Sequence, residues 1–381
     1  MLSKSLHPLN YITEGRKLGV AEETLLTADR LSRAIAMTGS TPVLSLGHLA
    51  SLTGASANYL RTIVDRSHDP YIQFERPKRT GGTRIISAPE PILMEVQRWL
   101  LHNALCHIRT HPSSFAYLAG RSSIDCSQMH VGARWLIKMD LKNFFGTISE
   151  WEVYRILREA NYSSLVSLEI TRLMTRVHSG AGYRSPRTRN KYPVIRGYAV
   201  SNTGVLPQGG PASGMLANAV MREVDQRLSE LAAAESLTYT RYSDDIAFST
   251  PGKLTREASQ SFIRKSSRII ENAGFLLQEK KTRVVPPGAR HIVLGLLVDN
   301  DRVRLMPEFK KRVGSHISGV KRFGLVEHSQ HRRFRSVLGF IRFVDGNLAH
   351  AAAVDPPWAA AMRTDWHEAL EHSSFPIASD H

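Results

Sequence analysis

Two adjacent carboxylates lie inside a largely apolar stretch of the sequence, TRYSDDIAFST, at residues 240–250. Tyr242 before the pair and the apolar residues after it favour β-strand structure. Burying Asp244 and Asp245 there without a partner would be very costly, so the pair predicts a bound positive charge. Adjacent strand residues point to opposite faces, and the two side chains share one site more easily at the tip of a hairpin.

A third acid comes from the segment RWLIKMDLKNFF, residues 134–145. Its apolar residues alternate onto one face of a predicted strand, and Asp140 falls on the other face near the strand's end. Such acids bind hard divalent cations through oxygen, and two metal ions about 4 Å apart can clamp the oxygens of a phosphoryl transfer. The alternative is that Asp244 and Asp245 only cap a turn, since a lone pair of aspartates is common.

Composition and charge point to a nucleic-acid partner. The 381 residues allow one large or two to three smaller domains. The 50 Lys and Arg exceed the 34 Asp and Glu, for a formal net charge of +16, which favours a polyanion. No apolar run reaches membrane-spanning length, and the first residues lack the apolar part of a secretory signal. Two cysteines, Cys106 and Cys126, make no disulfide framework, so we expect a cytoplasmic protein with no membrane partner.

Helical and strand patterns divide the chain into regions. Residues 1–75 are predicted to be helical, and 46–64 holds two short helices around a turn, either a packing hairpin or a DNA-reading helix-turn-helix. A glycine-punctuated β-hairpin is predicted in 74–91. The segment 184–196 has five basic residues and no acid, which predicts a solvated loop or a flap that contacts phosphate. Residues 301–350 are helical and hold eleven Lys and Arg against four Asp and Glu.

Several of these segments together resemble the palm of a reverse transcriptase. YSDD follows MDLKNFF and LPQGGPASGMLAN in the family's order and spacing, and GFLLQEKKTRVV resembles the lysine-bearing segment that comes next. KRTGGTRIISAPEPILMEVQRWLL resembles the fingers segment, so the set is far more specific than any one motif. The resemblance implies an α+β right-hand polymerase with fingers, a palm of antiparallel sheet plus helices, and a helical thumb. We expect an N-terminal helical region at 1–75, fingers and palm at 76–300, and a basic helical thumb with a C-terminal tail at 301–381.

Within this family the chain is similar to the bacterial retron type. AYLAGRSSIDCSQMHVG and HIVLGLLV stand where that group has characteristic stretches. Two departures are visible: CSQMH keeps only His130 of the pattern Asn-Ala-x-x-His, and Leu294 replaces the threonine of Val-Thr-Gly. The resemblance implies an RNA-directed DNA polymerase that copies part of a cognate structured noncoding RNA into single-stranded, branched RNA-linked DNA. It also implies a place in anti-phage defence beside a separate effector protein.

The resemblance also implies roles for individual residues. Asp140, Asp244 and Asp245 would be the catalytic acids and hold two Mg²⁺ ions, helped by the backbone carbonyl of Leu141. The residues expected to contact the dNTP substrate are Arg84, Phe145, Gln208, Gly209 and Lys281. Among these, Phe145 would exclude a ribose hydroxyl, Arg84 would meet the triphosphate, and Lys281 would donate a proton to pyrophosphate or attract it. The residues expected to contact nucleic acid are His130, Lys310, Lys311, Arg312, Lys321 and Arg322.

Other functions remain open at this point. The chain could be another defence-associated reverse transcriptase or a group II intron-like one. It could also be a noncatalytic RNA-binding scaffold with a relic palm, although the intact acids and Gln208 argue against a relic. A palm-type nucleotide cyclase also uses carboxylates and Mg²⁺, but it would need neither a basic thumb nor LPQGG.

Overall fold

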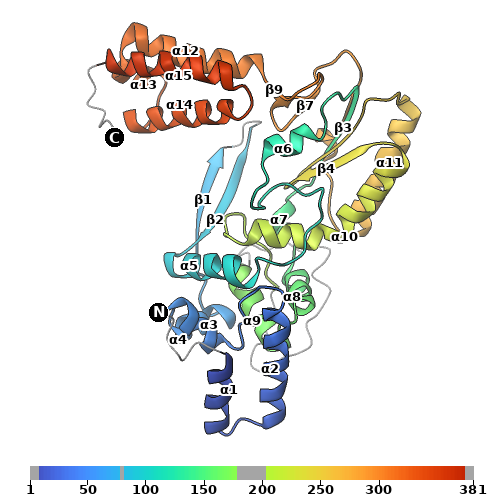
Figure 1. Cartoon of the computed structure of the whole chain (residues 1–381), viewed down its shortest axis with the longest axis vertical. Helices are drawn as coiled ribbons and strands as arrows, with labels where there is room; N and C mark the ends of the chain where they lie inside the picture. Colours follow the sequence, from blue (N-terminus) through green and yellow to red (C-terminus); the bar gives the residue numbers. More distant parts are fainter. Residues whose placement is uncertain (1–7, 78–80, 178–202, 374–381) are drawn as a thin grey trace.

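The computed structural model describes residues 8–77, 81–177 and 203–373, with side chains from residue 12 onward. The basic segment 184–196 lies outside these residues. In chain order the described part forms an N-terminal helical group, a two-stranded hairpin, a four-stranded sheet with covering helices, and a C-terminal helical group (Figure 1). No helix among the described residues is both long and apolar enough to cross a membrane. The predicted α+β class is confirmed.

The N-terminal group consists of α1 (Pro8–Lys17), α2 (Glu22–Ala36), α3 (Leu46–Thr53) and α4 (Ala57–Val64). Serine hydroxyls cap the starts of α3 and α4, and Gly54 ends α3 in a left-handed conformation. Leu60 and Ile63 of α4 have no exposed area and belong to the main core. The two helices predicted in 46–64 are confirmed, and their burial supports a packing hairpin over a DNA-reading one.

The hairpin after this group is antiparallel and pairs β1 (Tyr71–Pro77) with β2 (Thr83–Pro89). Gly81 and Gly82, just before β2, both have positive φ, as expected of a glycine-rich turn. Helix α5 (Pro91–Trp99) packs on β2 and continues into a π-helical turn, η2 (Leu100–Ala104). This is the hairpin predicted in 74–91.

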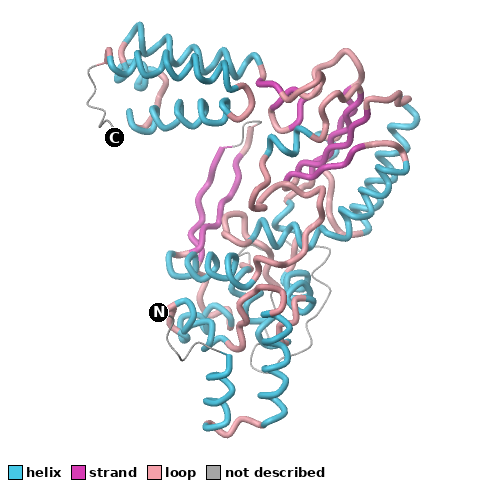
Figure 2. Tube along the Cα trace, viewed as in Figure 1, coloured by secondary structure: helices cyan, strands magenta, loops and turns pink. Residues whose placement is uncertain are grey.

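The central sheet is antiparallel, with strand order β4–β5–β3–β6; strands are magenta in Figure 2. Its strands are β3 (Trp135–Asp140), β4 (Thr238–Tyr242), β5 (Asp245–Thr250) and β6 (Arg283–Val285). Alternate residues such as Ile137 and Phe248 point into the main core, which also takes Leu216 and Leu228 of α10 and Phe262 of α11. The helices of this region are α6 (Ser123–Gln128), α7 (Phe144–Thr147), α8 (Glu150–Glu159), α9 (Ser164–Met174), α10 (Ser213–Ala234) and α11 (Arg256–Asn272). The main core therefore covers one face of the sheet, and the acids lie on the other, part of which is covered by a smaller apolar cluster around Leu136, Ala247 and Val293.

A short connecting region leads to the C-terminal helices. It contains η3 (Glu279–Lys281) and a small sheet of β7 (Ile292–Val293), β8 (Leu296–Leu297) and β9 (Arg304–Leu305). The helices are α12 (Pro307–Phe323), α13 (Leu325–His331), α14 (Val337–Ala352) and α15 (Pro356–Glu371). They have their own core around Val313, Phe340 and Trp366. Figure 1 shows them at one end of the molecule, with α1 and α2 at the other.

Candidate active site

The three predicted acids come together at one edge of the central sheet. Asp140, the last residue of β3, lies directly opposite Asp245, the first residue of β5. Opposed residues of an antiparallel pair carry their side chains on the same face, with Cβ atoms roughly 4.5–5.5 Å apart. The carbonyl of Asp244 accepts a hydrogen bond from the Leu141 N–H at 3.0 Å. The end of β3 is thus tied to the turn that carries the other two acids.

That turn is a tight hairpin. β4 ends at Tyr242 and β5 begins at Asp245, so Ser243 and Asp244 alone connect them. Ser243 has a φ of 59°, a left-handed conformation typical of two-residue hairpin loops. The hairpin tip predicted for this pair of acids is confirmed.

The surroundings of the acids disfavour negative charge. Burial raises the pKa of Asp140, although the hydrogen bond from Lys281 opposes that shift. Burial also raises the pKa of Asp245, and the neighbouring charge of Asp244 adds to the effect. The Lys281 Nζ lies 2.7 Å from Asp140 Oδ2, and this bond raises the pKa of the lysine. A cation bound between the acids would relieve their repulsion.

The donor chemistry of this edge fits a hard divalent cation. Within the residues that the structure describes, no three His, Cys, Asp or Glu side chains are already grouped as metal ligands. Asp140 instead directs Oδ2 at Lys281. Carboxylate oxygens are nevertheless the ligands that Mg²⁺ prefers, and burial and mutual repulsion already act on two of these carboxylates. The fit therefore rests on donor type and electrostatics.

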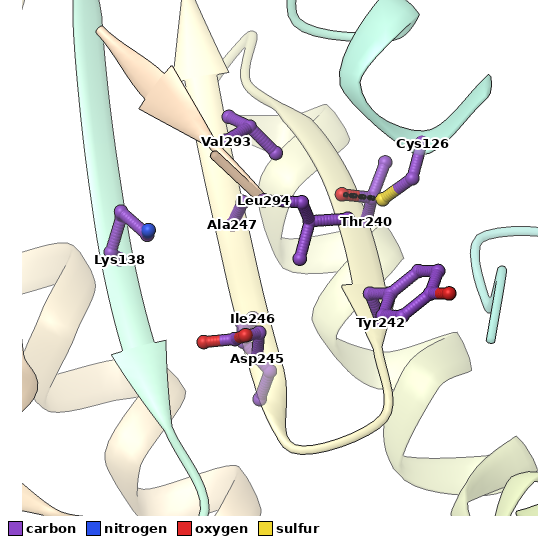
Figure 3. Close-up of a pocket in the computed structure, with 9 residues that line it drawn as sticks. All are labelled: Cys126, Lys138, Thr240, Tyr242, Asp245, Ile246, Ala247, Val293 and Leu294. Atoms are coloured by element: carbon purple, nitrogen blue, oxygen red, sulfur yellow. Dashed lines mark hydrogen bonds between the residues drawn. The ribbon is translucent and has the colours of Figure 1, made fainter. Parts of the chain in front are cut away.

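A small hollow lies beside Asp245 on the same face of the sheet (Figure 3). Its lining residues are Cys126, Lys138, Thr240, Tyr242, Asp245, Ile246, Ala247, Val293 and Leu294. Leu294 and Gly295 connect β7 to β8 with φ values of 48° and 85°, as in a type I′ turn. Leu294 is the residue that replaces the expected threonine, so it brings an apolar side chain to the hollow.

The glycine turn at 208–210 contacts the β1–β2 hairpin. The Ser87 N–H of β2 donates to the Gln208 carbonyl at 2.8 Å. Gly209 has a φ of 134°, and a Cβ there would lie 2.7 Å from the Ser87 carbonyl oxygen. Because that approach leaves no room for a side chain, glycine is required at this position. Gln208 and Gly209 thus lie against the strand that carries Arg84.

Arg84 lies opposite Arg76 in the hairpin register, and both side chains are exposed. Like charges directly opposite each other repel, so a bound anion would stabilise the pair. Of the two phenylalanines near the acids, Phe144 is buried in the core, as predicted, and Phe145 is half-buried. Phe145, five residues after Asp140, therefore keeps an accessible part, which its predicted substrate contact requires.

Sequence reasoning missed a buried ion pair beneath the acidic turn. Arg241 has no exposed area, and its guanidinium donates to both Asp225 oxygens, at 2.7 and 2.6 Å. It also donates to the Ser243 carbonyl at 3.0 Å, to Asn218 Oδ1 at 3.0 Å and to Ser114 Oγ at 3.2 Å. One signal in the sequence could have indicated it: Arg241 stands between residues with strand character. An arginine buried in such a strand needs a buried acid as its partner. The network holds the backbone just before Asp244.

His130 lies against β4 and β5, on the face of the sheet that carries the acids, and is 1% exposed. Its Nδ1 lies 2.7 Å from Ser249 Oγ and its Nε2 lies 2.7 Å from Thr240 Oγ1. Burial lowers the pKa of His130 to about 4. This geometry does not support the RNA contact predicted from the sequence, because both ring nitrogens are engaged inside the protein. His130 instead connects α6's end to β4 and β5.

The five predicted nucleic-acid contacts of α12 divide into two sets. Lys310 pairs with Asp355 at 2.5 Å, and Lys321 pairs with Asp365 and Glu368 of α15 at 2.7 and 3.0 Å. These two lysines therefore stabilise the packing of the helical group, and the expectation that they contact nucleic acid loses support. Lys311, Arg312, Lys321 and Arg322 are exposed, and of these four only Lys321 forms an ion pair with residues that the structure describes.

The fold and the site together define a nucleic-acid polymerase. The antiparallel sheet, with acids at facing strand ends and helices on one face, corresponds to the palm, and the preceding hairpin corresponds to the fingers. Residues 76–312 match the family described as reverse transcriptase (RNA-dependent DNA polymerase). Since that match covers more than half of the chain, the protein belongs to the reverse transcriptase family. The fold and family expected from YSDD and LPQGG are thereby confirmed.

Relatives within the family are retron enzymes. The chain is 32% identical over 272 residues to the retron Mx162 reverse transcriptase of Myxococcus xanthus, covering 68% of this chain and 54% of that protein. It is 30% identical over 293 residues to the retron Mx65 reverse transcriptase of the same organism, covering 77% of this chain and 63% of that protein. The retron Ec86 reverse transcriptase of Escherichia coli is 25% identical over 307 residues, covering 80% of this chain and 86% of that protein. The chain thus spans less than two thirds of the two Myxococcus relatives.

Solved structures with a similar arrangement are more distant. A telomerase from Candida albicans, in complex with a telomeric RNA fragment, has a TM-score of 0.44 at 14% identity, covering 82% of this chain and 58% of that one. A foamy viral protease–reverse transcriptase in complex with double-stranded DNA has a TM-score of 0.40 at 14% identity, covering 80% of this chain and 42% of that one.

Proposed function

We propose that this chain is an RNA-directed DNA polymerase of the retron type, which copies part of a cognate structured noncoding RNA into single-stranded DNA. The observation that carries the proposal is the register pairing of Asp140 with Asp245, with Asp244 in the adjoining turn. Membership of the reverse transcriptase family supports the same reaction.

Catalysis would rest on positioning and charge. Asp140, Asp244 and Asp245, with the Leu141 carbonyl, would hold two Mg²⁺ ions, which supply Lewis acidity to the attacking hydroxyl and the leaving pyrophosphate. The Lys281 ammonium donates a hydrogen bond to Asp140 Oδ2 at 2.7 Å, so a charged donor already lies beside the acids. Exchange of that bond for the pyrophosphate would place a proton donor at the leaving group.

The incoming dNTP would lie between the palm acids and the β1–β2 hairpin. Arg84 would contact the triphosphate, and its repulsion from Arg76 favours such an anion. Gln208 and Gly209 would shape the pocket where they meet Ser87. The half-buried Phe145 would face the sugar and exclude a 2′-hydroxyl. The nucleotide pocket would therefore draw on three separate segments of the chain.

The RNA partner would be held mainly through its backbone. Exposed Lys311, Arg312 and Arg322 of α12 are the best-placed thumb cations, and their contacts would weaken with salt. As the retron resemblance implies, the product would be branched RNA-linked DNA, and the enzyme would work in the cytoplasm with a separate anti-phage effector. Residues 1–75, 76–300 and 301–381 would serve as N-terminal helical region, fingers with palm, and thumb with tail.

The proposal is tested with purified protein, its copurified RNA and dNTPs. Asp244→Asn is expected to abolish DNA synthesis while leaving RNA binding intact, and Asp301→Asn, an exposed acid, is the matched control. Sequencing the copurified nucleic acid is expected to show a 2′–5′ branch. Unbranched DNA would favour another defence-associated or group II intron-like enzyme. Full biological activity of Asp244→Asn would instead establish the noncatalytic scaffold.

A further inference from the structure

Tyr117 contacts three motifs of the site, although it belongs to none of them. Its ring lies edge-on to Phe145, with centroids 6.0 Å apart and an interplanar angle of 66°. Its hydroxyl lies 3.1 Å from Ser243 Oγ in the acidic turn. A Cβ on Gly214, at the start of α10, would meet the Tyr117 ring at 2.2 Å. The glycine is therefore needed for the ring to lie against α10.

The backbone holds this tyrosine in an unusual conformation. Tyr117 has a φ of 61°, which is rare for a bulky residue and costs energy unless the surroundings impose it. The preceding residues supply that constraint: the Ala116 carbonyl accepts from Asn218 Nδ2 at 2.6 Å, and the Phe115 N–H donates to the Arg241 carbonyl at 2.9 Å. Tyr117 as a whole stays 54% exposed although its ring and hydroxyl contact the site, so burial alone does not explain the strained backbone.

From these contacts we infer that Tyr117 is a positioning residue for nucleotide selection. Its ring fixes the orientation of Phe145, which sets how tightly the site closes around the sugar C2′. Its hydroxyl fixes Ser243 and thereby the turn that carries Asp244. The inference deepens the proposed function and rests on it, because it assigns the discrimination between deoxyribo- and ribonucleotides to this pair of rings.

The two parts of Tyr117 have separable effects. Tyr117→Leu removes the edge-to-face ring contact and is expected to lower the ratio of kcat/KM for dNTP over NTP by roughly 2- to 10-fold. Tyr117→Phe keeps the ring and removes the hydroxyl, so the ratio should stay at the wild-type value while kcat falls by roughly 2- to 10-fold. Ser243→Ala breaks the same hydrogen bond, so combining it with Tyr117→Phe should lower kcat no further than either change alone.

The experiment is single-nucleotide primer extension on an RNA template with dNTP or NTP, using the full chain. A wild-type chain that extends no primer would overturn the proposed function and this inference together. An active wild type with an unchanged ratio in folded Tyr117→Leu would overturn the inference alone. If Tyr117→Leu does not fold, the Tyr117→Phe and Ser243→Ala pair decides: non-additive kcat losses support the inference, and additive losses or none refute it.

Discussion

The buried pair of Arg241 and Asp225 gives the most demanding prediction about the palm. Both side chains have no exposed area, and the guanidinium makes two bonds to Asp225 and one to the Ser243 carbonyl. Arg241→Gln would leave the Asp225 charge buried without its partner. Removing one member of a buried pair costs about 3–5 kcal/mol, because the remaining charge loses its compensation in a medium that solvates it poorly.

Native-state hydrogen exchange of the β4–β5 hairpin measures this cost locally. A loss of about 3–5 kcal/mol in opening free energy corresponds to exchange at least about a hundredfold faster for amides of residues 238–250, provided that exchange reports the opening equilibrium. Amides of α14 and α15, in the separate C-terminal core, are the internal control and should keep their protection.

A double variant separates stability from positioning. Arg241→Met with Asp225→Leu replaces the ion pair by apolar side chains, which is often neutral or stabilising for a buried pair. Protection of the hairpin should therefore return, but DNA synthesis should not, since the Ser243 carbonyl would still lack its donor. Unchanged exchange in Arg241→Gln, or wild-type synthesis by the double variant, would refute this account.

Three further predictions follow from the same structure. Burial lowers the pKa values of His130 and His316 to about 4, and an unfolded histidine titrates near 6.5. Below pH 6.5 the unfolded chain binds more protons, so stability should be lost as pH falls toward 4, by about 2 kcal/mol at pH 5 for His130 and by less for His316 of α12; thermal melts should show a smaller acid loss for His130→Gln and His316→Gln. Gly209→Ala should raise KM for dNTP in primer extension, because the added Cβ meets the Ser87 carbonyl, and unchanged kinetics would contradict the close approach. Arg322→Gln should flatten the slope of log affinity for RNA against log salt by roughly one, whereas Lys321→Gln, which breaks its pairs with α15, should lower the melting temperature and leave that slope alone.

Local patterns were sufficient to predict the elements that carry the acids. The alternation before Asp140 predicts β3, and the acidic pair between strand-forming residues predicts a hairpin tip, because side-chain periodicity and turn geometry act over a few residues. These features need no knowledge of what lies across the core.

Partners contributed by distant segments could not be predicted in this way. Arg241 contacts Asp225, Ser114 and Asn218 only in the folded chain, where β4 packs on α10. Likewise, no residue near Lys321 in the sequence indicates that it pairs with the acids of α15. His130 shows the same difficulty, because a single histidine looks the same in the sequence whether it contacts RNA at the surface or connects buried strands. Residue type and charge predicted a nucleic-acid contact for Lys321 and His130, but tertiary packing determines which groups their side chains contact.

The contacts around the acidic turn explain why it can be both strained and firmly placed. Ser243 and Tyr117 both adopt left-handed backbone conformations, and each would cost energy in isolation. Their side chains contact each other, Arg241 holds the Ser243 carbonyl, and Asn218 holds the residue before Tyr117. Asn218 and Asp225 both come from α10, which begins just after the glycine turn that contacts β2. One helix therefore supports the acids, the ring beside Phe145 and the nucleotide side of the site together, so a displacement of α10 should alter substrate selection and rate together, whereas the loss of a single contact should alter one of them.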